Sequence, residues 1–281
     1  MAVERVGVVG SGIMGAGIAE TAAAAGFKVV LRTRASAGAT MAAIERSLAK
    51  QVERGKRSPA EADEVAGRVT VTCELADLAD CDLVLECVVE DLATKQSLFR
   101  ELDRVVQPGA VLATGTSTLP VVELAVQTTR PDAVCGVHFF NPAPLMPLVE
   151  VVRALTSSDA TIGTATAFAL ACGKQPIVVK DEAGFIVNHL LFPYLNNAVR
   201  LLERGMASCE DIDAAMRGGC NFPIGPLALL DLVGLDTSVA ILDALYDEFR
   251  DPHYAPVPTL RRMVAAGHLG RKSGRGFYAY G

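Results

Sequence analysis

A short glycine-rich turn near the start of the chain limits its fold more than any other feature. Gly10, Gly12 and Gly15 follow the apolar run Arg5-Val-Gly-Val-Val9 and precede a segment that favours a helix up to about Ala25. In such a strand–turn–helix unit, the first glycine permits the tight turn, the second lets the backbone approach a pyrophosphate, and the third lets helix and strand pack closely. The N–H groups at the helix N-terminus favour phosphate. The pattern predicts a dinucleotide site with contacts from Gly10, Gly12, Ile13, Met14 and Gly15.

Apolar runs typical of strands alternate with helical segments over the first 184 residues. After the strand expected at 27–31, further strands are expected at 69–71, 82–86, 110–113, 133–137, 148–152 and 175–179, with helices at 91–106 and 158–172. This alternation predicts an α/β fold with a Rossmann-type doubly wound sheet. Residues 36–67 are rich in Ala, Glu, Arg and Lys and are broken by Gly55 and Ser58-Pro59, which predicts a helical hairpin inserted after the second strand.

From Phe185 onward the pattern changes to helices alone, expected at 185–204, 208–217, 226–249 and 257–266. We expect Asp181-Glu-Ala-Gly184 to be a hinge between a dinucleotide-binding domain, 1–184, and an all-helical substrate and dimerisation domain, 185–281. Apolar residues at the start of the second domain, such as Leu190 and Phe192, favour burial against a second copy. We therefore expect a homodimer.

Composition excludes several classes of protein. The net charge is −6 and no block of like charges occurs, so nucleic acid is not an expected partner. The seven cysteines form no CxxC pair and the four histidines lack metal-ligand spacing, which favours reduced thiols and no metal site. No apolar run approaches the roughly 20 residues of a membrane span, and the N-terminus lacks the form of a signal peptide. These features predict a cytoplasmic protein that does not bind membranes.

A second constrained stretch runs from His138 to Glu150. His138 ends an apolar run, and prolines at 142, 144 and 147 make the connector that follows it stiff. A lone histidine in an apolar segment is often only a core residue. Here a stiff connector between two strands can hold the imidazole against the carboxylate of Glu150, which would otherwise be a charge among valines and leucines. Such a carboxylate fixes the tautomer of the ring, so the pair predicts a general base.

Two further strand ends carry candidate ligand contacts. The polar turn Thr114-Gly-Thr-Ser-Thr118 follows a predicted strand, so Ser117 is expected either to meet the substrate or to cap the next helix. The second strand ends in Arg32, Thr33 and Arg34, where an NAD site usually has an acidic residue for the ribose hydroxyls. Arginines can face a ribose 2′-phosphate or be merely solvated. We expect NAD as the cofactor, with NADP as the alternative.

The motifs along the whole chain resemble those of the short 3-hydroxyacyl-CoA dehydrogenases of fatty acid metabolism, above all the bacterial 3-hydroxybutyryl-CoA dehydrogenases. The resemblance runs from Val6 to Tyr280. It rests on Gly10-Ser-Gly-Ile-Met-Gly-Ala-Gly-Ile-Ala-Glu20, Glu86-Cys-Val-Val-Glu90 with Lys95, His138-Phe-Phe-Asn-Pro-Ala-Pro144, Gly184-Phe-Ile-Val-Asn188, Pro223-Ile-Gly-Pro226, Asp231-Leu-Val-Gly-Leu-Asp236 and Gly270-Arg-Lys-Ser-Gly-Arg-Gly-Phe-Tyr278.

The resemblance implies an oxidoreductase and a role for each matching residue. His138 corresponds to the catalytic base, Glu150 to its partner, Ser117 to the hydroxyl that bonds the substrate's C3 oxygen, and Asn188 to the residue that positions the substrate. Glu90, Lys95, Asn141 and Lys272 fall on the family's cofactor-binding positions. Cofactor contacts are also expected from Ser117 and from Arg32, Thr33 and Arg34 at the end of the second strand. The inserted hairpin contacts coenzyme A in the family, which implies that role for Lys50 and Lys56 among the basic residues Lys50, Arg54, Lys56 and Arg57. An ordinary solvated helix face is the alternative explanation of these charges.

Three positions depart from the family pattern. Gly115 stands where an asparagine is usual, Thr33 replaces the common ribose-binding aspartate, and His189 replaces the arginine after Asn188. These departures leave open a related substrate, a hydroxyacyl group carried by an acyl carrier protein in a biosynthetic pathway. A non-catalytic, crystallin-like protein that binds the cofactor is the alternative of another class. The intact set of Ser117, His138, Glu150 and Asn188 favours the enzyme.

Overall fold

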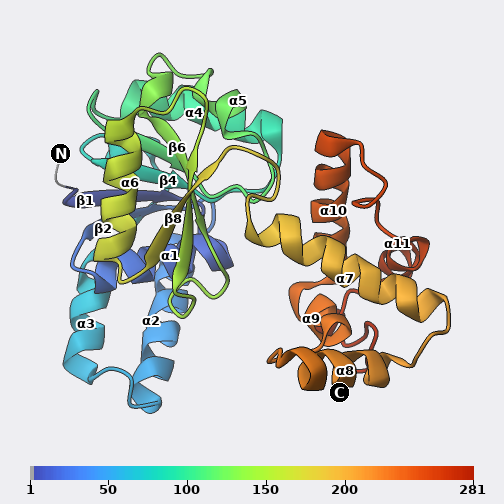
Figure 1. The fold of residues 1–281 in the computed structure, drawn as a ribbon. Coiled ribbons are helices and arrows are strands. Elements are labelled where there is room, and N and C mark those ends of the chain that lie inside the picture. The colour runs from blue at the N-terminus through green and yellow to red at the C-terminus, as the bar shows by residue number, and fades with distance from the viewer. Residues whose placement is uncertain (1–2) are drawn as a thin grey trace. The chain divides into compact units, whose positions relative to one another are not determined.

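One eight-stranded sheet organises the residues up to Asp181, which form the first of two compact units; Glu182–Gly281 form the second. The structure is a computed structural model and describes residues 3–281. The strand order is β3-β2-β1-β4-β5-β6-β7-β8 (Figure 1). All neighbouring strands are parallel except β6 and β7, which are antiparallel. The strands are β1 (Arg5–Val9), β2 (Lys28–Arg32), β3 (Val69–Thr72), β4 (Leu83–Glu86), β5 (Val111–Thr114), β6 (Val134–Phe139), β7 (Leu148–Arg153) and β8 (Gln175–Lys180).

Helices cover both faces of this sheet, which confirms the predicted doubly wound α/β fold. The chain leaves β1 toward β2 through α1 (Ile13–Ala24) and leaves β4 toward β5, in the opposite direction along the sheet, through α4 (Leu92–Val105). Because parallel crossovers are right-handed, α1 and α4 lie on opposite faces. The helix α6 (Asp159–Ala171) shares one apolar core cluster with α1, in which Ile18 and Phe168 are buried. The short helices α5 (Val121–Ala125), η1 (Leu75–Leu78) and η2 (Pro131–Ala133) complete the connections.

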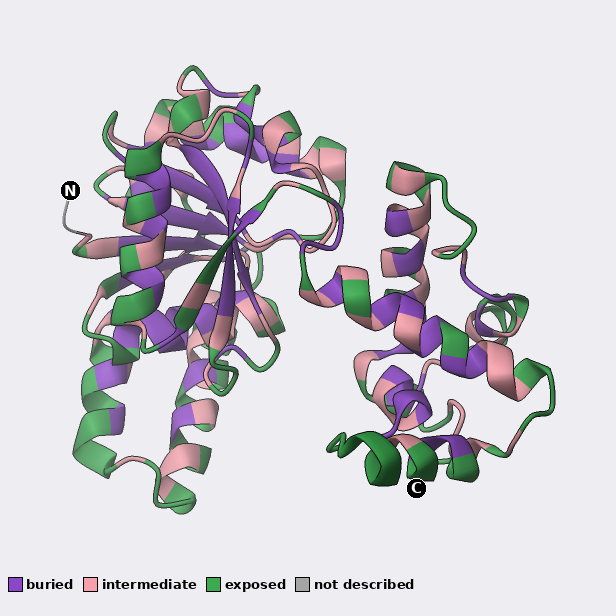
Figure 2. Ribbon diagram, in the orientation of Figure 1, coloured by how far each residue is buried: buried purple, intermediate pink, exposed green. Residues whose placement is uncertain are grey.

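The inserted hairpin is present as α2 (Ala37–Glu53) and α3 (Pro59–Gly67), which extend away from the sheet (Figure 1). Ser36 caps α2, and Ser58 forms a reciprocal capping box with Glu61 at the start of α3. The inner ends of the two helices bury apolar residues against α1, whereas their outer ends are exposed (Figure 2). The hairpin therefore exposes Lys50, Arg54 and Lys56 to solvent, whereas Arg57 is half-buried.

The second unit is helical, as predicted, and packs around one apolar core. Its elements are α7 (Val187–Glu203), α8 (Cys209–Cys220), α9 (Pro226–Val233), α10 (Leu235–Phe249), α11 (Pro258–Ala265) and η3 (Arg271–Ser273). The prediction of a single helix over 226–249 is wrong, because two helices, α9 and α10, occupy this range. Gly234 lies between α9 and α10 with φ 104°, a conformation that an α-helix does not allow and that glycine adopts at little cost. No helix among residues 3–281 is long and apolar enough to cross a membrane.

Two buried carboxylates, Asp213 and Asp231, account for the family motifs at 223–226, 231–236 and 270–278. Asp213 accepts hydrogen bonds from the backbone N–H groups of Leu227 and Ala228 at the start of α9, at 2.8 and 2.9 Å. Asp231 accepts hydrogen bonds from the N–H groups of Phe277 and Tyr278, both at 2.9 Å. These contacts fasten α8 to α9 and the C-terminal segment to α9, so the motifs around them stabilise the helical unit.

We expect Gly225→Ala to lower the free energy of unfolding of the helical unit by about 1–3 kcal/mol, because an added methyl group overpacks a filled site. A Cβ atom at position 225 would lie 2.2 Å from the carboxyl carbon of Asp213. Gly218→Ala is the matched control, since position 218 lies in α8 with no neighbouring atom within 4 Å of an added Cβ. Urea unfolding followed by circular dichroism should show a lower midpoint for the first variant alone; equal midpoints for the two variants would contradict the packing argument.

Candidate active site

Three side chains from separate segments, Ser117, His138 and Glu150, form one hydrogen-bonded chain at an end of the sheet. In the antiparallel pair β6–β7, His138 lies directly opposite Glu150. The imidazole Nδ1 is 2.8 Å from Oε2 of Glu150, and Nε2 is 3.1 Å from Oγ of Ser117 in the turn after β5. His138 and Glu150 are 5% and 1% exposed. The sequence placed these two residues on either side of a connector, and the strand register makes them a directly opposed pair.

The hydrogen bonds determine which nitrogen can act as a base. An ionised carboxylate only accepts hydrogen bonds, so Nδ1–H of His138 donates to Glu150. The neutral ring then has its lone pair on Nε2, the nitrogen on the side of Ser117. A hydroxyl group placed beside Nε2 and Ser117 could give its proton to the ring while Glu150 stabilises the resulting imidazolium.

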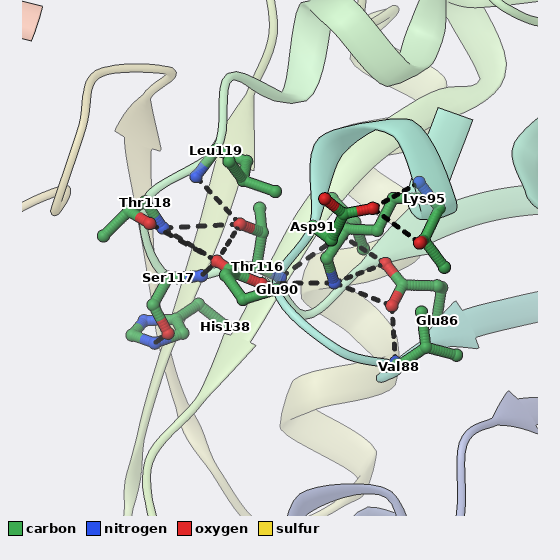
Figure 3. Close-up of polar contacts among 12 residues, drawn as sticks. Glu86, Val88, Glu90, Asp91, Lys95, Thr116, Ser117, Thr118, Leu119 and His138 are labelled. Carbon is green, nitrogen blue, oxygen red and sulfur yellow. Dashed lines mark hydrogen bonds and ion pairs between the residues drawn. The ribbon is translucent and has the colours of Figure 1, made fainter. Parts of the chain in front are cut away.

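Glu90 holds the turn that carries Ser117 (Figure 3). Its Oε1 atom accepts hydrogen bonds from Thr116 Oγ1 at 2.5 Å and from the backbone N–H of Ser117 at 2.9 Å. The N–H of Thr118 lies within 3.3 Å of the same oxygen. One carboxylate thus orders three consecutive residues of the turn, and Ser117 Oγ remains directed to His138.

Lys95 links Glu90 to a second carboxylate, Glu86, which was not among the predicted site residues. Lys95 Nζ lies 2.7 Å from Glu86 and 3.2 Å from Glu90, and both Lys95 and Glu86 are almost fully buried. Glu86 also accepts hydrogen bonds from Thr114 Oγ1 at 2.8 Å and from the N–H of Val88 at 2.6 Å. The only signal in the sequence was a carboxylate at the end of an apolar strand with a lysine nine residues later, and it does not show that the two side chains meet.

This network shifts the pKa values of its members. Burial alone would raise the pKa of Glu90, but the charge of Lys95 and the hydrogen bonds from Thr116 and Ser117 outweigh it and hold that pKa below its usual value. Burial would lower the pKa of Lys95, but the charges of Glu86 and Glu90 outweigh it and raise that pKa. Both groups are therefore charged at neutral pH, and the turn carrying Ser117 rests on an ion pair.

The glycine turn fits a dinucleotide pyrophosphate. A Cβ atom at Gly15 would lie 1.8 Å from the carbonyl oxygen of Gly10, and Gly10 itself has φ 111°, so both positions require glycine. A Cβ atom at Gly12 would meet no atom within 4 Å, which leaves open space in front of α1. No side chain caps the N-terminus of α1, and its backbone N–H groups can bind an anion. Ile13, in the first turn of α1, is 79% exposed, and Met14 follows it.

A cavity of about 270 Å³ lies between the first turns of α1, the hairpin and the proline connector. It is lined by Ile13 and Gly17 of α1, by Lys50 and Lys56 of the hairpin, and by Asn141 at the start of the connector. Arg54 lines the same cavity, whereas Arg57 lines a neighbouring one. Four residues predicted separately from the sequence, Ile13, Asn141, Lys50 and Lys56, therefore border one space.

Other predicted site residues are engaged elsewhere. Asn188 lies in α7 of the helical unit and is 8% exposed. Lys272, in η3 of the same unit, forms an ion pair with Asp236. In the first unit, Thr33 is 1% exposed, and Arg32 donates to the carbonyl oxygen of Cys73 at 3.2 Å. The cofactor and substrate contacts expected of these residues stay predictions.

Two departures from the family pattern have local structural explanations. A Cβ atom at Gly115 would lie 3.2 Å from the carbonyl oxygen of Glu86 and 3.3 Å from Sγ of Cys87, so a side chain there would press on its neighbours. His189 hydrogen-bonds to Tyr254 at 2.8 Å, and its ring also packs on that of Phe249. The histidine is thus part of an aromatic cluster inside the helical unit.

A dinucleotide-binding sheet with a histidine–carboxylate pair at its strand ends defines a nicotinamide-dependent dehydrogenase. The comparison with protein families agrees. Residues 5–182 match the 3-hydroxyacyl-CoA dehydrogenase NAD binding domain, and residues 184–280 match the 3-hydroxyacyl-CoA dehydrogenase C-terminal domain. The chain belongs to the 3-hydroxyacyl-CoA dehydrogenase family, as its motifs suggested.

Known members of the family are similar over almost the whole chain. A 3-hydroxybutyryl-CoA dehydrogenase of Mycobacterium tuberculosis is 50% identical, with 99% of each chain covered. The mitochondrial hydroxyacyl-coenzyme A dehydrogenase of Homo sapiens is 42% identical, covering 99% of this chain and 91% of its own. The crystal structure of an (S)-3-hydroxybutyryl-CoA dehydrogenase of Ralstonia eutropha superposes with a TM-score of 0.96 at 41% identity, covering 100% of each chain. The sheet and the helical unit therefore have the family's architecture.

Proposed function

We propose that this dehydrogenase transfers a hydride between C3 of a short (S)-3-hydroxyacyl-CoA, such as 3-hydroxybutyryl-CoA, and NAD. The line of Ser117, His138 and Glu150 is the observation that carries the proposal. It offers one basic nitrogen and one hydroxyl group to the same substrate oxygen, at 3.1 Å from each other. The relatives whose names specify a CoA thioester favour this substrate over the same acyl group on a carrier protein.

The proton step follows from the tautomer of His138. In the oxidation direction, Nε2 takes the proton of the C3 hydroxyl group, and Glu150 stabilises the imidazolium through Nδ1–H. Ser117 donates a hydrogen bond to the oxygen on which negative charge develops. The nicotinamide ring, when bound, supplies the hydride acceptor. In the reduction direction the imidazolium returns its proton to the same oxygen.

The cavity beside the hairpin is the proposed route of the CoA moiety. Coenzyme A carries several phosphate charges, and this acidic protein needs local cations to bind it. Lys50 and Lys56 are exposed and border the cavity that leads to Asn141 and the proline connector. We assign Lys50 and Lys56 to the phosphate groups of CoA, Glu90, Lys95 and Asn141 to the dinucleotide site, and His138, Ser117 and Glu150 to the reacting end.

The roles of the helical unit rest on its family motifs. We propose that residues up to about 184 bind the dinucleotide and that 185–281 contribute substrate contacts through Asn188, a cofactor contact through Lys272, and the homodimer interface. Leu190 and Leu232 are 68% and 52% exposed and are the apolar side chains proposed for that interface. Phe192, expected there from the sequence, is 2% exposed and instead belongs to the core of the helical unit. The cytoplasmic location stays a prediction.

The direct test is a panel of hydroxyacyl thioesters assayed with the purified chain. We expect turnover of (S)-3-hydroxybutyryl-CoA with NAD, measured by absorbance of the reduced nicotinamide. Turnover of a carrier-bound hydroxyacyl group with negligible turnover of the CoA ester would overturn the substrate assignment. Absence of turnover with both, in a protein that still binds the dinucleotide, would instead support the crystallin-like alternative.

Replacement of Lys50 and Lys56 by alanine together is expected to raise KM for 3-hydroxybutyryl-CoA by about tenfold, equivalent to about 1.4 kcal/mol of binding, with little change in kcat. The reason is the loss of cations that bind only the non-reacting part of the substrate. Arg57→Ala is the matched control, because it removes a charge from the same hairpin outside this cavity. An equal rise in KM for the control would show that only the net charge of the hairpin matters.

A further inference from the structure

The end of β2 lacks the group that normally selects NAD. In dinucleotide-binding sheets, an acidic residue about 20 positions after the first glycine binds the hydroxyl groups of the adenosine ribose and repels a 2′-phosphate. Thr33 occupies this position, and the preceding backbone is joined to the glycine turn through the hydrogen bond from the N–H of Gly10 to the carbonyl of Arg32, at 2.9 Å. The position is therefore built as in other dinucleotide sites but carries no negative charge.

Thr33 cannot replace the missing carboxylate, because its hydroxyl group is already used. It is 1% exposed, and it accepts hydrogen bonds from the N–H of Ala35 at 3.0 Å and from Oγ1 of Thr40 at 3.4 Å. Its third contact, 2.6 Å to Oγ of Ser11, then uses its own hydrogen. Ser11 lies in the glycine turn between Gly10 and Gly12, and its hydroxyl hydrogen is left for a ligand. A hydrogen-bond donor at this point suits phosphate oxygens, which only accept.

Both charged residues that flank Thr33 along the chain are positive. Arg32 is half-buried and is held by the carbonyl of Cys73, whereas Arg34 is exposed and makes no hydrogen bond or ion pair to another residue within 3–281. No acidic residue occurs between Lys28 and Thr40 or in the first turn of α2. On the facing segment after β3, the carboxylate of Asp77 is hydrogen-bonded to Thr72 at 2.5 Å, and Glu74 is exposed.

We propose that this site binds NADP(H) about as well as NAD(H), with Arg34 as the residue that contacts the 2′-phosphate and Ser11 as a second donor. The inference rests on the dinucleotide-binding part of the proposed function and is independent of the thioester. Arginine is suited to this role because its planar guanidinium presents two donors to phosphate oxygens. Arg32 adds positive potential without needing to leave the carbonyl of Cys73.

The test is a titration of the purified, substrate-free protein with NADPH and with NADH, followed by fluorescence of the reduced nicotinamide. We expect the two Kd values to agree within about tenfold for the unmodified chain. Arg34→Ala should weaken NADPH by about tenfold and NADH by less than about twofold, since one charge-assisted phosphate contact is lost. Thr33→Asp should weaken NADPH further and favour NADH, because it restores the carboxylate.

Lys28→Ala is the matched control, since Lys28 is an exposed cation at the opposite end of β2; both Kd values should stay unchanged. NADPH binding more than about tenfold weaker than NADH in the unmodified chain would overturn the proposal. So would an Arg34→Ala variant that weakens both dinucleotides alike or neither. The titration contains no substrate, so a chain that fails to turn over hydroxyacyl-CoA can still confirm NADP(H) binding. A chain that turns over the substrate with NADH but does not bind NADPH refutes the NADP(H) proposal and leaves the proposed function standing.

Discussion

Replacing His138 with alanine is expected to lower kcat by about 10²–10⁴-fold, the range usual for loss of a positioned general base. The variant keeps Ser117 and Glu150 but removes the imidazole between them, whose Nε2 lies 3.1 Å from Ser117 and whose Nδ1 lies 2.8 Å from Glu150. Steady-state assays with 3-hydroxybutyryl-CoA and NAD give the rate. A rate within a few-fold of that of the unmodified chain would refute the role of His138 as the base.

Glu150→Gln separates the proton step from mere packing in the same assay. The amide keeps the shape of the carboxylate, but it can donate to Nδ1, which moves the lone pair away from Nε2 and leaves the imidazolium without its anion. We expect a loss of kcat of about tenfold or more with unchanged NADH binding. Unchanged kcat would mean that Glu150 only fills space opposite His138. Circular dichroism and dinucleotide titration show whether each variant is folded.

Replacing Lys95 with methionine is expected to lower the free energy of unfolding of the sheet-containing unit by about 3–5 kcal/mol, the usual cost of leaving one partner of a buried ion pair uncompensated. Lys95 is 1% exposed, and Glu86, at 2.7 Å, is fully buried. For a unit of this size, the melting temperature should fall by about 6–20 °C. Thermal unfolding monitored by circular dichroism measures this change.

The double variant Glu86→Gln with Lys95→Met is the control for that result. It removes the charges of Glu86 and Lys95, so the fully buried carboxylate is gone, while Glu90 keeps its charge without its lysine partner. Part of the stability should therefore return. A double variant as unstable as the sum of the two single variants would show that the residues act independently. Lys95→Met should also loosen Glu90 and with it the turn of Ser117, so its kcat should fall even at temperatures where the protein is folded.

Much of the fold follows from local patterns. Each apolar run expected to be a strand is one, within one or two residues at its ends. The hairpin expected at 36–67 begins at Ala37 and ends at Gly67. These features depend on side-chain periodicity and caps within a few residues, which a sequence displays directly. The single helix expected at 226–249 was wrong because its boundary depends on a backbone angle that side-chain periodicity does not show. Gly234 interrupts a continuous apolar pattern, and only its backbone angle shows that one helix ends and another begins.

The candidate site was less completely predictable. His138, Glu150 and Ser117 were identified from their types and from family motifs, yet the sequence gives no distance between them. Glu86 was overlooked because a carboxylate at a strand end does not reveal that a lysine from the next helix will cover it. Whether Lys95 reaches Glu86 depends on how α4 packs against the sheet.

The sequence by itself determined the order of the strands along the chain, the need for glycine at the turn before α1, and membership of the family. Those properties follow from backbone conformational preferences and motif order along the chain. Only the tertiary structure decided that His138 and Glu150 are opposite in register, that Glu90 orders the turn of Ser117, and that Thr33 is buried and hydrogen-bonded. The reason is physical: these contacts join residues up to 28 positions apart, such as Glu90 and Thr118. Strand register and side-chain packing determine such contacts, and neither is a local property of the sequence.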